Sequence, residues 1–138
     1  MPLGLLSLVI LTVLVIYYDL SFRLIPNWLS IAILFASCVF FGAKSLGYLT
    51  FLSLSLYCLF YFKVIGGGDV KLALAYFIAI DSNLYTDVIL LILTLGGILG
   101  FICCVALKLS GTASIRTYNL PYGIPIGLSG FLGIVASI

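Results

Sequence analysis

The sequence KVIGGGDVKLALA, residues 63–75, separates two strongly apolar segments and contains one acidic side chain, that of Asp69. Three consecutive glycines, Gly66, Gly67 and Gly68, precede the aspartate, so the backbone is flexible and can approach other groups closely. An aspartate between glycines and an apolar run is also a good helix N-cap. This stretch therefore predicts a turn leading into a helix, with a carboxylate at the junction.

The rest of the chain has the composition of a protein surrounded by lipid. Of its 138 residues, 64% are hydrophobic and 7% are charged, and the mean hydropathy is +1.40. A water-soluble domain carries charges on about a quarter of its residues. We therefore expect an integral membrane protein in contact with lipid. The small net charge of +2, without a basic run, argues against a nucleic-acid partner.

Six apolar segments divide the chain, at residues 2–18, 28–43, 46–62, 70–80, 88–107 and 122–138. All are expected to be helices, because only helices and closed barrels satisfy backbone groups in lipid, and these runs are too long and too continuous for barrel strands. The first lacks the charged start and cleavage site of a signal peptide. The expected fold is one all-α membrane domain, residues 1–138, with six transmembrane helices.

Basic residues gather in the loops after the first, third and fifth segments: Arg23, Lys63, Lys71, Lys108 and Arg116. The opposite face has Lys44, together with Asp81 and Asp87. By the positive-inside rule, the first set of loops is cytoplasmic and both termini lie outside. Asp19 and Asp69 are then expected on the same, cytoplasmic side.

Glycine spacing in the last two segments predicts close helix packing. The spaced pairs are Gly96 and Gly100, Gly123 and Gly127, and Gly130 and Gly133.

The chain offers few groups for acid–base chemistry, since it has no Glu, no His and only four Asp residues. Asp81 and Asp87 are interpreted as solvated turn or helix-cap residues. The four cysteines lie in apolar segments without a Cys-x-x-Cys pair, so no metal site, disulfide framework or cofactor is expected.

Asp19 lies near the end of the first predicted helix, where the helix dipole disfavours a negative charge. One interpretation is an ion pair with Arg23, four residues later. Another interpretation is a pair with Asp69, which is expected on the same side of the membrane. Two carboxylates in close contact cannot both ionise, so this pair would share a proton. One can then act as general base toward a water while its protonated partner hydrogen-bonds the substrate carbonyl. This pairing predicts the chemistry of aspartic peptide hydrolysis.

Three sequence elements resemble one protein family. Residues 66–69, GGGD, match the Gly-x-Gly-Asp signature of membrane aspartic proteases, and the longer run GGGDVKL is similar to that of the type IV prepilin peptidases. Residues 19–27, DLSFRLIPN, resemble that family's first-aspartate motif. Residues 121–123, PYG, resemble its late Pro-aromatic-Gly element. The three elements occur in order across nearly the whole chain.

The resemblance implies a six-helix membrane protease core of the GxGD type with Asp19 and Asp69 as the catalytic dyad. Such enzymes remove the leader from type IV prepilins and pseudopilins at the cytoplasmic face of the bacterial inner membrane. The orientation expected from charge agrees. Long members also methylate the new N-terminus through a region with paired Cys-x-x-Cys motifs. Here the first helix begins at once, so methylation is not expected, and the chain resembles the short peptidases of tight-adherence pilus systems.

Residues beside the two aspartates have alternative interpretations. Lys71 could favour the ionised dyad or hold a lipid or substrate carboxylate, but it could equally anchor the chain at the membrane surface, as could Arg23. Pro26 and Asn27 are interpreted as the start of the second helix, with Asn27 satisfying exposed backbone groups.

Aromatic and proline residues complete the set of site-shaping candidates. Tyr17 and Tyr18 are interpreted as interface aromatics, with a hydroxyl near the dyad as the alternative. Pro121, Tyr122 and Gly123, with a second proline at 125, predict a break in the last helix, whose non-helical backbone could pair with an extended substrate.

A second function class is a non-enzymatic polytopic membrane module, either a small transporter or a pilus-assembly scaffold. Acidic residues inside a membrane indicate function in both cases. The small size, the missing acidic relay and the absence of repeats argue against transport.

Overall fold

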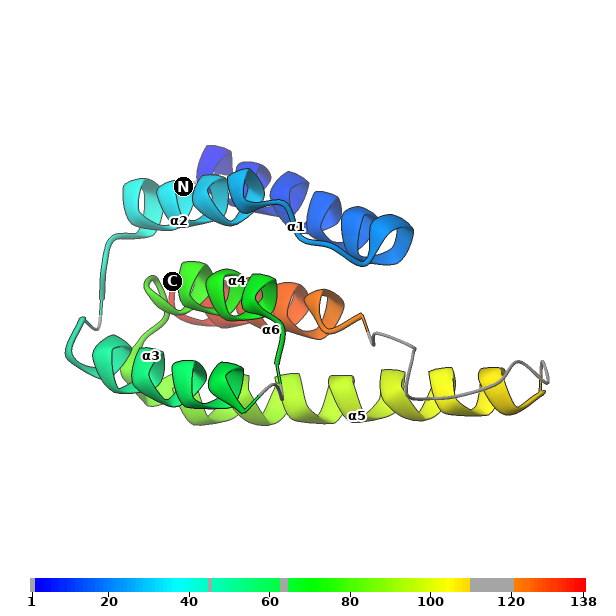
Figure 1. The fold of residues 1–138 in the computed structure, drawn as a ribbon. Helices are drawn as coiled ribbons and strands as arrows, with labels where there is room; N and C mark the ends of the chain where they lie inside the picture. Colours follow the sequence, from blue (N-terminus) through cyan, green and yellow to red (C-terminus); the bar gives the residue numbers. More distant parts are fainter. Residues whose placement is uncertain (1, 45, 63–64, 110–120) are drawn as a thin grey trace.

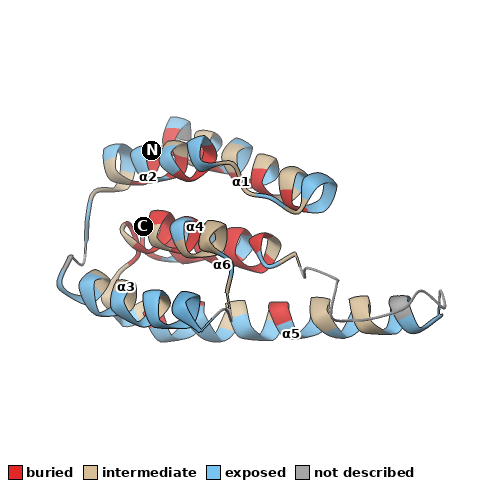
Figure 2. Ribbon diagram, viewed as in Figure 1, coloured by how far each residue is buried: buried red, intermediate tan, exposed pale blue. Residues whose placement is uncertain are grey.

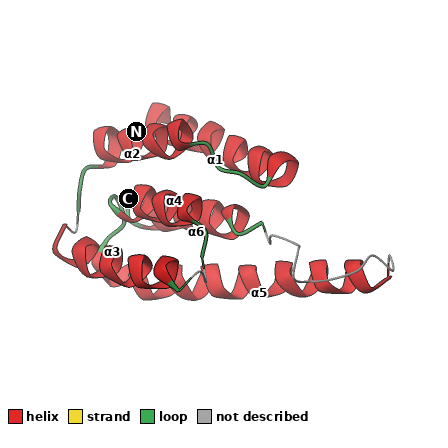
Figure 3. Ribbon diagram, in the orientation of Figure 1, coloured by secondary structure: helices red, strands yellow, loops and turns green. Residues whose placement is uncertain are grey.

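The computed structural model describes residues 2–44, 46–62, 65–109 and 121–138. Over these residues the regular structure is helical, without strands (Figure 3). Its elements are α1 (Pro2–Phe22), α2 (Asn27–Phe41), α3 (Leu46–Tyr61), α4 (Gly67–Phe77), the short 3-10 helix η1 (Ser82–Leu84), α5 (Tyr85–Leu109) and α6 (Gly123–Ala136). The prediction of an all-α fold with six helices is confirmed for this part of the chain.

Consecutive α-helices run in opposite directions and form three layers (Figure 1). α4 and α6 lie side by side in the middle layer, α1 and α2 cover one side of it, and α3 and α5 cover the other. α4 packs against α2, α3 and α6, while α6 packs against α1, α4 and α5. At one end of the bundle, α1 and α3 therefore finish where α2, α4 and α6 begin.

Burial follows this layering (Figure 2). The most buried side chains lie in the middle layer and include Tyr76 and Phe77 of α4 and Ile134 of α6. The outer helices α3 and α5 expose large apolar side chains, such as Phe101, which is 70% exposed. Among the described helices, the segments Leu3–Phe22 and Ser82–Ala106 are long and apolar enough to cross a membrane.

Glycines on α6 allow neighbouring helices to approach closely. A Cβ atom at Gly130 would lie 2.5 Å from Cγ of Tyr76, and one at Gly133 would lie 2.7 Å from Cγ2 of Val88. Both distances are too short for any larger residue. The close packing predicted from glycine spacing is therefore confirmed at these two positions.

The start of α4 differs from the prediction. The helix begins at Gly67 with Gly66 as its N-cap, three residues before the predicted start at residue 70. Asp69 is therefore the third residue of the helix. The prediction that it caps the helix from the N-cap position is wrong.

The start of α6 also differs. The helix begins at Gly123 and includes Pro125 in its first turn. Proline is tolerated there because the N–H groups of the first turn have no acceptor within the helix. The predicted break of the last helix is therefore wrong from Gly123 onward.

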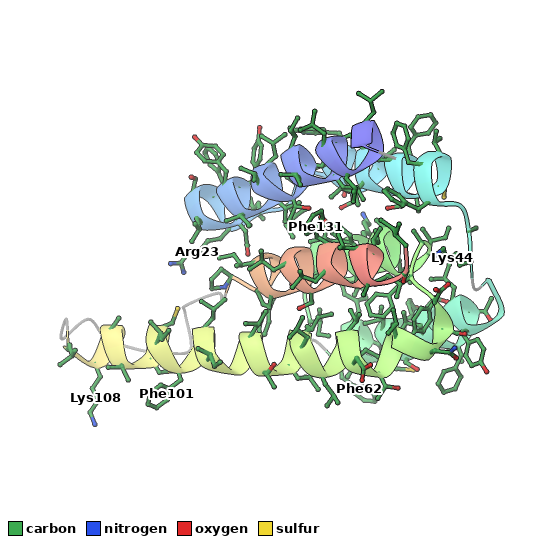
Figure 4. The ribbon with its side chains drawn as sticks, turned by 180° about the vertical axis from the view of Figure 1, so that it is seen from behind. Arg23, Lys44, Phe62, Phe101, Lys108 and Phe131 are labelled. Atoms are coloured by element: carbon green, nitrogen blue, oxygen red, sulfur yellow. The ribbon has the colours of Figure 1, made fainter. Side chains whose placement is uncertain are left out.

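Charged residues mark the two ends of the bundle. Figure 4 shows Arg23 and Lys108 toward one end and Lys44 at the other. Lys44 lies 3.5 Å from the carboxylate of Asp81 and donates a hydrogen bond to the backbone carbonyl of Ser137. Asp81, interpreted from the sequence as a solvated turn or helix-cap residue, is the N-cap residue of η1, and its side chain is 48% exposed and pairs with Lys44. Of the basic residues used to predict orientation, Lys63 and Arg116 lie outside the described residues.

Candidate active site

Asp19 lies in the last turn of α1, and its side chain is buried, with 5% of its surface exposed. Its Oδ2 atom accepts a hydrogen bond of 3.1 Å from the backbone N–H of Ile124. Ile124 is the second residue of α6, so this N–H is one of the donors that a helix leaves unsatisfied at its start. The positive end of α6 therefore compensates for the placement of an acid at the negative end of α1.

Gly123 makes this contact sterically possible. A Cβ atom at position 123 would lie 2.8 Å from Oδ2 of Asp19 and 2.9 Å from Cδ1 of Ile25. Only glycine leaves enough room for the carboxylate to approach the start of α6. The PYG element at residues 121–123 thus positions a helix start against Asp19.

Asp69 enters the same region from the first turn of α4. Its carboxylate accepts a hydrogen bond from the backbone N–H of Gly66, the N-cap residue. This is the geometry by which an acidic third residue satisfies a free donor at a helix start. A Cβ atom at Gly66 would lie 3.1 Å from Oδ2 of Asp69, so the glycine permits the reach back.

The protonation of Asp69 is strongly perturbed. Asp69 precedes the apolar run of residues 70–80, and burial is the main cause that raises its pKa from 3.8 to about 6. The negative charge of Asp19 raises this pKa further, and the hydrogen bond from Gly66 opposes both effects. The two carboxylates therefore interact electrostatically, although 50 residues of sequence separate them.

Both carboxylates line one pocket of about 840 Å³ at the end of the bundle where α1 finishes and α4 begins. Its lining comprises Asp19, Arg23, Leu24, Ile25, Asn27, Phe60, Tyr61, Ile65, Gly66, Gly67, Gly68, Asp69 and Tyr122. The lining thus combines two carboxylates, three consecutive glycines and mostly apolar or aromatic side chains. Such a pocket can take a short extended peptide with one peptide bond beside the carboxylates.

Arg23 ends α1 in an unusual backbone conformation. Its φ angle is +52°, in the left-handed region that residues other than glycine rarely adopt. Its backbone N–H donates to the carbonyl of Asp19 at 3.1 Å, which closes the last turn of the helix. The guanidinium is close enough to Asp19 to act on its charge. The structure therefore brings Arg23 to the pocket, at the end of the bundle seen in Figure 4.

Lys71 and Asn27 form a separate pair. The Lys71 ammonium donates a hydrogen bond of 3.0 Å to Oδ1 of Asn27, which joins α4 to α2. Lys71 is exposed and lies outside the pocket lining, so the structure does not bring it to the two aspartates. Pro26 is the N-cap residue of α2 and makes no capping hydrogen bond through its side chain. That Asn27 satisfies exposed backbone groups there stays a prediction, and the partner shown for its side chain is Lys71.

The remaining sequence candidates divide in two. Tyr122 lines the pocket, whereas Tyr17 and Tyr18 do not and instead make edge contacts in an aromatic group with Phe22 and Trp28. Pro121 also lies outside the pocket lining.

Sequence reasoning did not identify the apolar wall of the pocket, which consists of Leu24, Ile25, Phe60, Tyr61 and Ile65. Leu24 and Ile25 lie within the DLSFRLIPN motif, whereas the signal for Phe60, Tyr61 and Ile65 was only their proximity in sequence to the GGGD motif. In the described part of the chain, no three His, Cys, Asp or Glu side chains gather as metal ligands would.

Comparison with known proteins gives one match. The model of the type IV leader peptidase family matches residues 6–105, more than two thirds of the chain, and this segment contains both aspartates. The match ends before the PYG element. No curated protein and no solved structure matches the chain.

Proposed function

The chain belongs to the type IV leader peptidase family, and from this we propose that it is an aspartic endopeptidase that uses Asp19 and Asp69 as its catalytic dyad. The observation that carries the proposal is the convergence of these two carboxylates, one buried and one partly buried, in one pocket. The raised pKa of Asp69, about 6, also supports the proposal, because the pair would then keep a proton at a higher pH than an ordinary aspartate does.

In the proposed reaction the pair carries one proton in total. The ionised carboxylate removes a proton from a bound water, and the water oxygen attacks the carbonyl carbon of the scissile peptide bond. The protonated carboxyl donates to the carbonyl oxygen as the tetrahedral intermediate forms. Collapse of this intermediate breaks the C–N bond, with a proton delivered to the leaving nitrogen. The amide of Ile124 holds Asp19 in place throughout.

We further propose that the bundle spans the bacterial inner membrane. The exposed apolar side chains of the outer helices would contact lipid, and a surface of this kind would be unfavourable in water. Arg23 and Lys108 lie toward the end of the bundle that carries the pocket, so the positive-inside rule puts the pocket at the cytoplasmic face and both termini outside.

The proposed substrate is a type IV prepilin or pseudopilin. Its polar leader lies in the cytoplasm and its apolar segment lies in the membrane, so the bond between them is at the depth of the pocket. The extended backbone at this junction would fit beside the glycines at the start of α4, residues 66–68.

Leader removal from a co-expressed prepilin tests the dyad directly. We expect Asp19→Asn and Asp69→Asn each to lower the cleavage rate by at least about 10²–10⁴-fold, because each removes a group needed for proton transfer. The rate is measured by the mobility shift of the prepilin, with the amount of membrane-inserted enzyme measured in parallel.

Asp87→Asn is the matched control, since Asp87 is exposed in the first turn of α5 and lies outside the pocket. If either dyad variant is inserted normally and cleaves like Asp87→Asn, the dyad is wrong. If the unmodified protein cleaves no prepilin, the non-enzymatic membrane module becomes the better assignment.

A further inference from the structure

A buried hydrogen bond joins α1 to α4 inside the apolar core. The hydroxyls of Thr12 and Tyr76 lie 2.7 Å apart, and both residues are buried. Thr12 Oγ1 also donates to the carbonyl of Leu8 at 2.7 Å. Because the threonine hydroxyl has only one proton, Tyr76 is the donor in the pair.

This pair is in helical register with the two aspartates. Thr12 lies seven residues before Asp19 on α1, and Tyr76 lies seven residues after Asp69 on α4. Seven residues are close to two helical turns, so each hydroxyl lies on the same helix face as the aspartate of its own helix, about 10 Å along the axis.

The two helices run in opposite directions (Figure 1). Moving forward seven residues from Thr12 reaches Asp19, and moving back seven residues from Tyr76 reaches Asp69. Because the helices are antiparallel, both aspartates therefore lie toward the same end of the bundle. The hydroxyl pair and the carboxylate pair thus lie at two levels between α1 and α4, two helices that share α2 and α6 as their main packing partners. Any sliding or rotation that breaks one level displaces the other.

Glycines of α6 allow side chains of both levels to pack against this helix. The Tyr76 ring lies against Gly130, where a Cβ atom would approach to 2.5 Å. A Cβ atom at Gly127 would lie at an ordinary contact distance of 3.6 Å from Cγ2 of Thr12, and Asp19 lies against Gly123. Positions 123, 127 and 130 share one face of α6, so the same helix covers both levels.

A hydroxyl pair specifies register better than an apolar pair would. Phenylalanine and valine could pack at several offsets, whereas a buried hydroxyl that loses its partner carries a desolvation penalty. We propose that Thr12 and Tyr76 are positioning residues that set the register of α1 against α4, and thereby the separation of the Asp19 and Asp69 carboxylates. Their role in cleavage rests on the proposed function, but their role in geometry does not.

Kinetics of single variants test the catalytic consequence. Tyr76→Phe and Thr12→Val each remove the bond with little change in shape, and we expect kcat to fall about 10- to 100-fold, as for a small misplacement of reacting groups, with KM within about twofold. The double variant should be no slower than the single ones, because both changes remove one shared interaction. Thr12→Ser keeps the hydroxyl and should restore most of the rate.

Ser37→Ala is the matched control, because Ser37 Oγ is fully buried and has no hydrogen-bond partner in the described part of the chain. The pH profile is a readout that loss of stability alone would not move. The titratable or charged side chains that face Asp69 in the pocket are Asp19, Arg23, Tyr61 and Tyr122. If the carboxylates separate, Asp19 raises the pKa of Asp69 less, so the alkaline limb should shift to lower pH in Tyr76→Phe.

A second measurement tests the geometry without activity. Cysteines replace Asp19 and Asp69 in a chain whose four native cysteines are alanines, and a short bis-maleimide then links the pair. We expect Tyr76→Phe to lower the rate of cross-linking several-fold, while Ser37→Ala leaves it unchanged.

Equal cross-linking rates with and without Tyr76→Phe would overturn the positioning role, whether or not the unmodified enzyme cleaves prepilin. A lower rate would support it even if prepilin cleavage fails. Wild-type kcat and an unshifted pH profile in Tyr76→Phe, together with an active unmodified enzyme, would also overturn the proposal.

Discussion

The carboxylate of Asp19, at the end of α1, accepts a hydrogen bond from a backbone amide 105 residues later in the sequence. The donor is the N–H of Ile124, and Gly123 leaves the space for this contact. Neither partner could be deduced from the charge pattern around Asp19, which suggested an ion pair with Arg23 or a pairing with Asp69. Arg23 does act on Asp19, but it also ends the helix in a left-handed conformation that no sequence rule predicts for arginine.

Gly123→Ala tests the contact between α6 and Asp19. The new Cβ would lie 2.8 Å from Oδ2 of Asp19, so the carboxylate and the helix start must move apart. We expect prepilin cleavage to fall about 10- to 100-fold, because the proposed dyad of Asp19 and Asp69 would lose its alignment. Gly97→Ala is the control, since a Cβ there meets no described atom within 4 Å. Equal cleavage rates in the two variants would show that the contact is not needed.

The pKa of Asp69 predicts the alkaline limit of activity. The proposed reaction requires one proton on the pair, and Asp69, with a pKa of about 6, loses its proton as the pH rises through that value. Activity should therefore be retained just below pH 6 and fall by about tenfold per pH unit above it. Initial cleavage rates in detergent at constant ionic strength measure this. A rate that still rises between pH 6 and pH 8 would contradict the assignment.

At the scale of the elements, apolar runs predicted which segments are helices but not where the helices begin and end. α1 continues four residues past its predicted end, because the carboxylate of Asp19 is satisfied by another helix. α4 starts three residues early, because Asp69 reaches back to the N–H of Gly66. Hydropathy counts such polar and glycine residues as loop, since it contains no information about tertiary partners. Helix ends at the site were therefore the least predictable part of the fold.

Contacts between elements that are distant in sequence likewise could not be predicted from the sequence. Lys71 could be assigned to lipid, substrate or dyad, and its actual partner, Asn27, lies 44 residues away. Thr12 and Tyr76 were not singled out, because hydroxyls in apolar helices are common. Their spacing of seven residues from each aspartate was the available signal, and it has meaning only once both aspartates are known to face each other.

At the scale of the whole molecule, the two ends of the bundle have separate tasks. The pocket lies at one end, while Lys44, Asp81 and Ser137 join helix ends at the other. The outer helices α3 and α5 pack mainly on one side, and their remaining faces are apolar. Residues at the end opposite the pocket should therefore affect folding more than chemistry.

Lys44→Met tests this separation. The variant loses a partly exposed ion pair and a hydrogen bond, so we expect the free energy of unfolding to fall by about 1 kcal/mol. Thermal unfolding in detergent measures this change, and kcat for prepilin cleavage should stay within about twofold of wild type. A large loss of kcat in the folded variant would mean that the two ends of the bundle are coupled.

The hydrogen bond from Ile124 to Asp19 also bears on the order of events during synthesis. The ribosome produces α1 first and α6 last, so Asp19 leaves the ribosome long before the amide that holds it. Until α6 enters the bundle, Asp19 lacks this donor and Tyr122 does not line the pocket. If Asp19 and Asp69 form the proposed dyad, a nascent chain with both aspartates already inserted would remain inactive until the final helix joins the bundle.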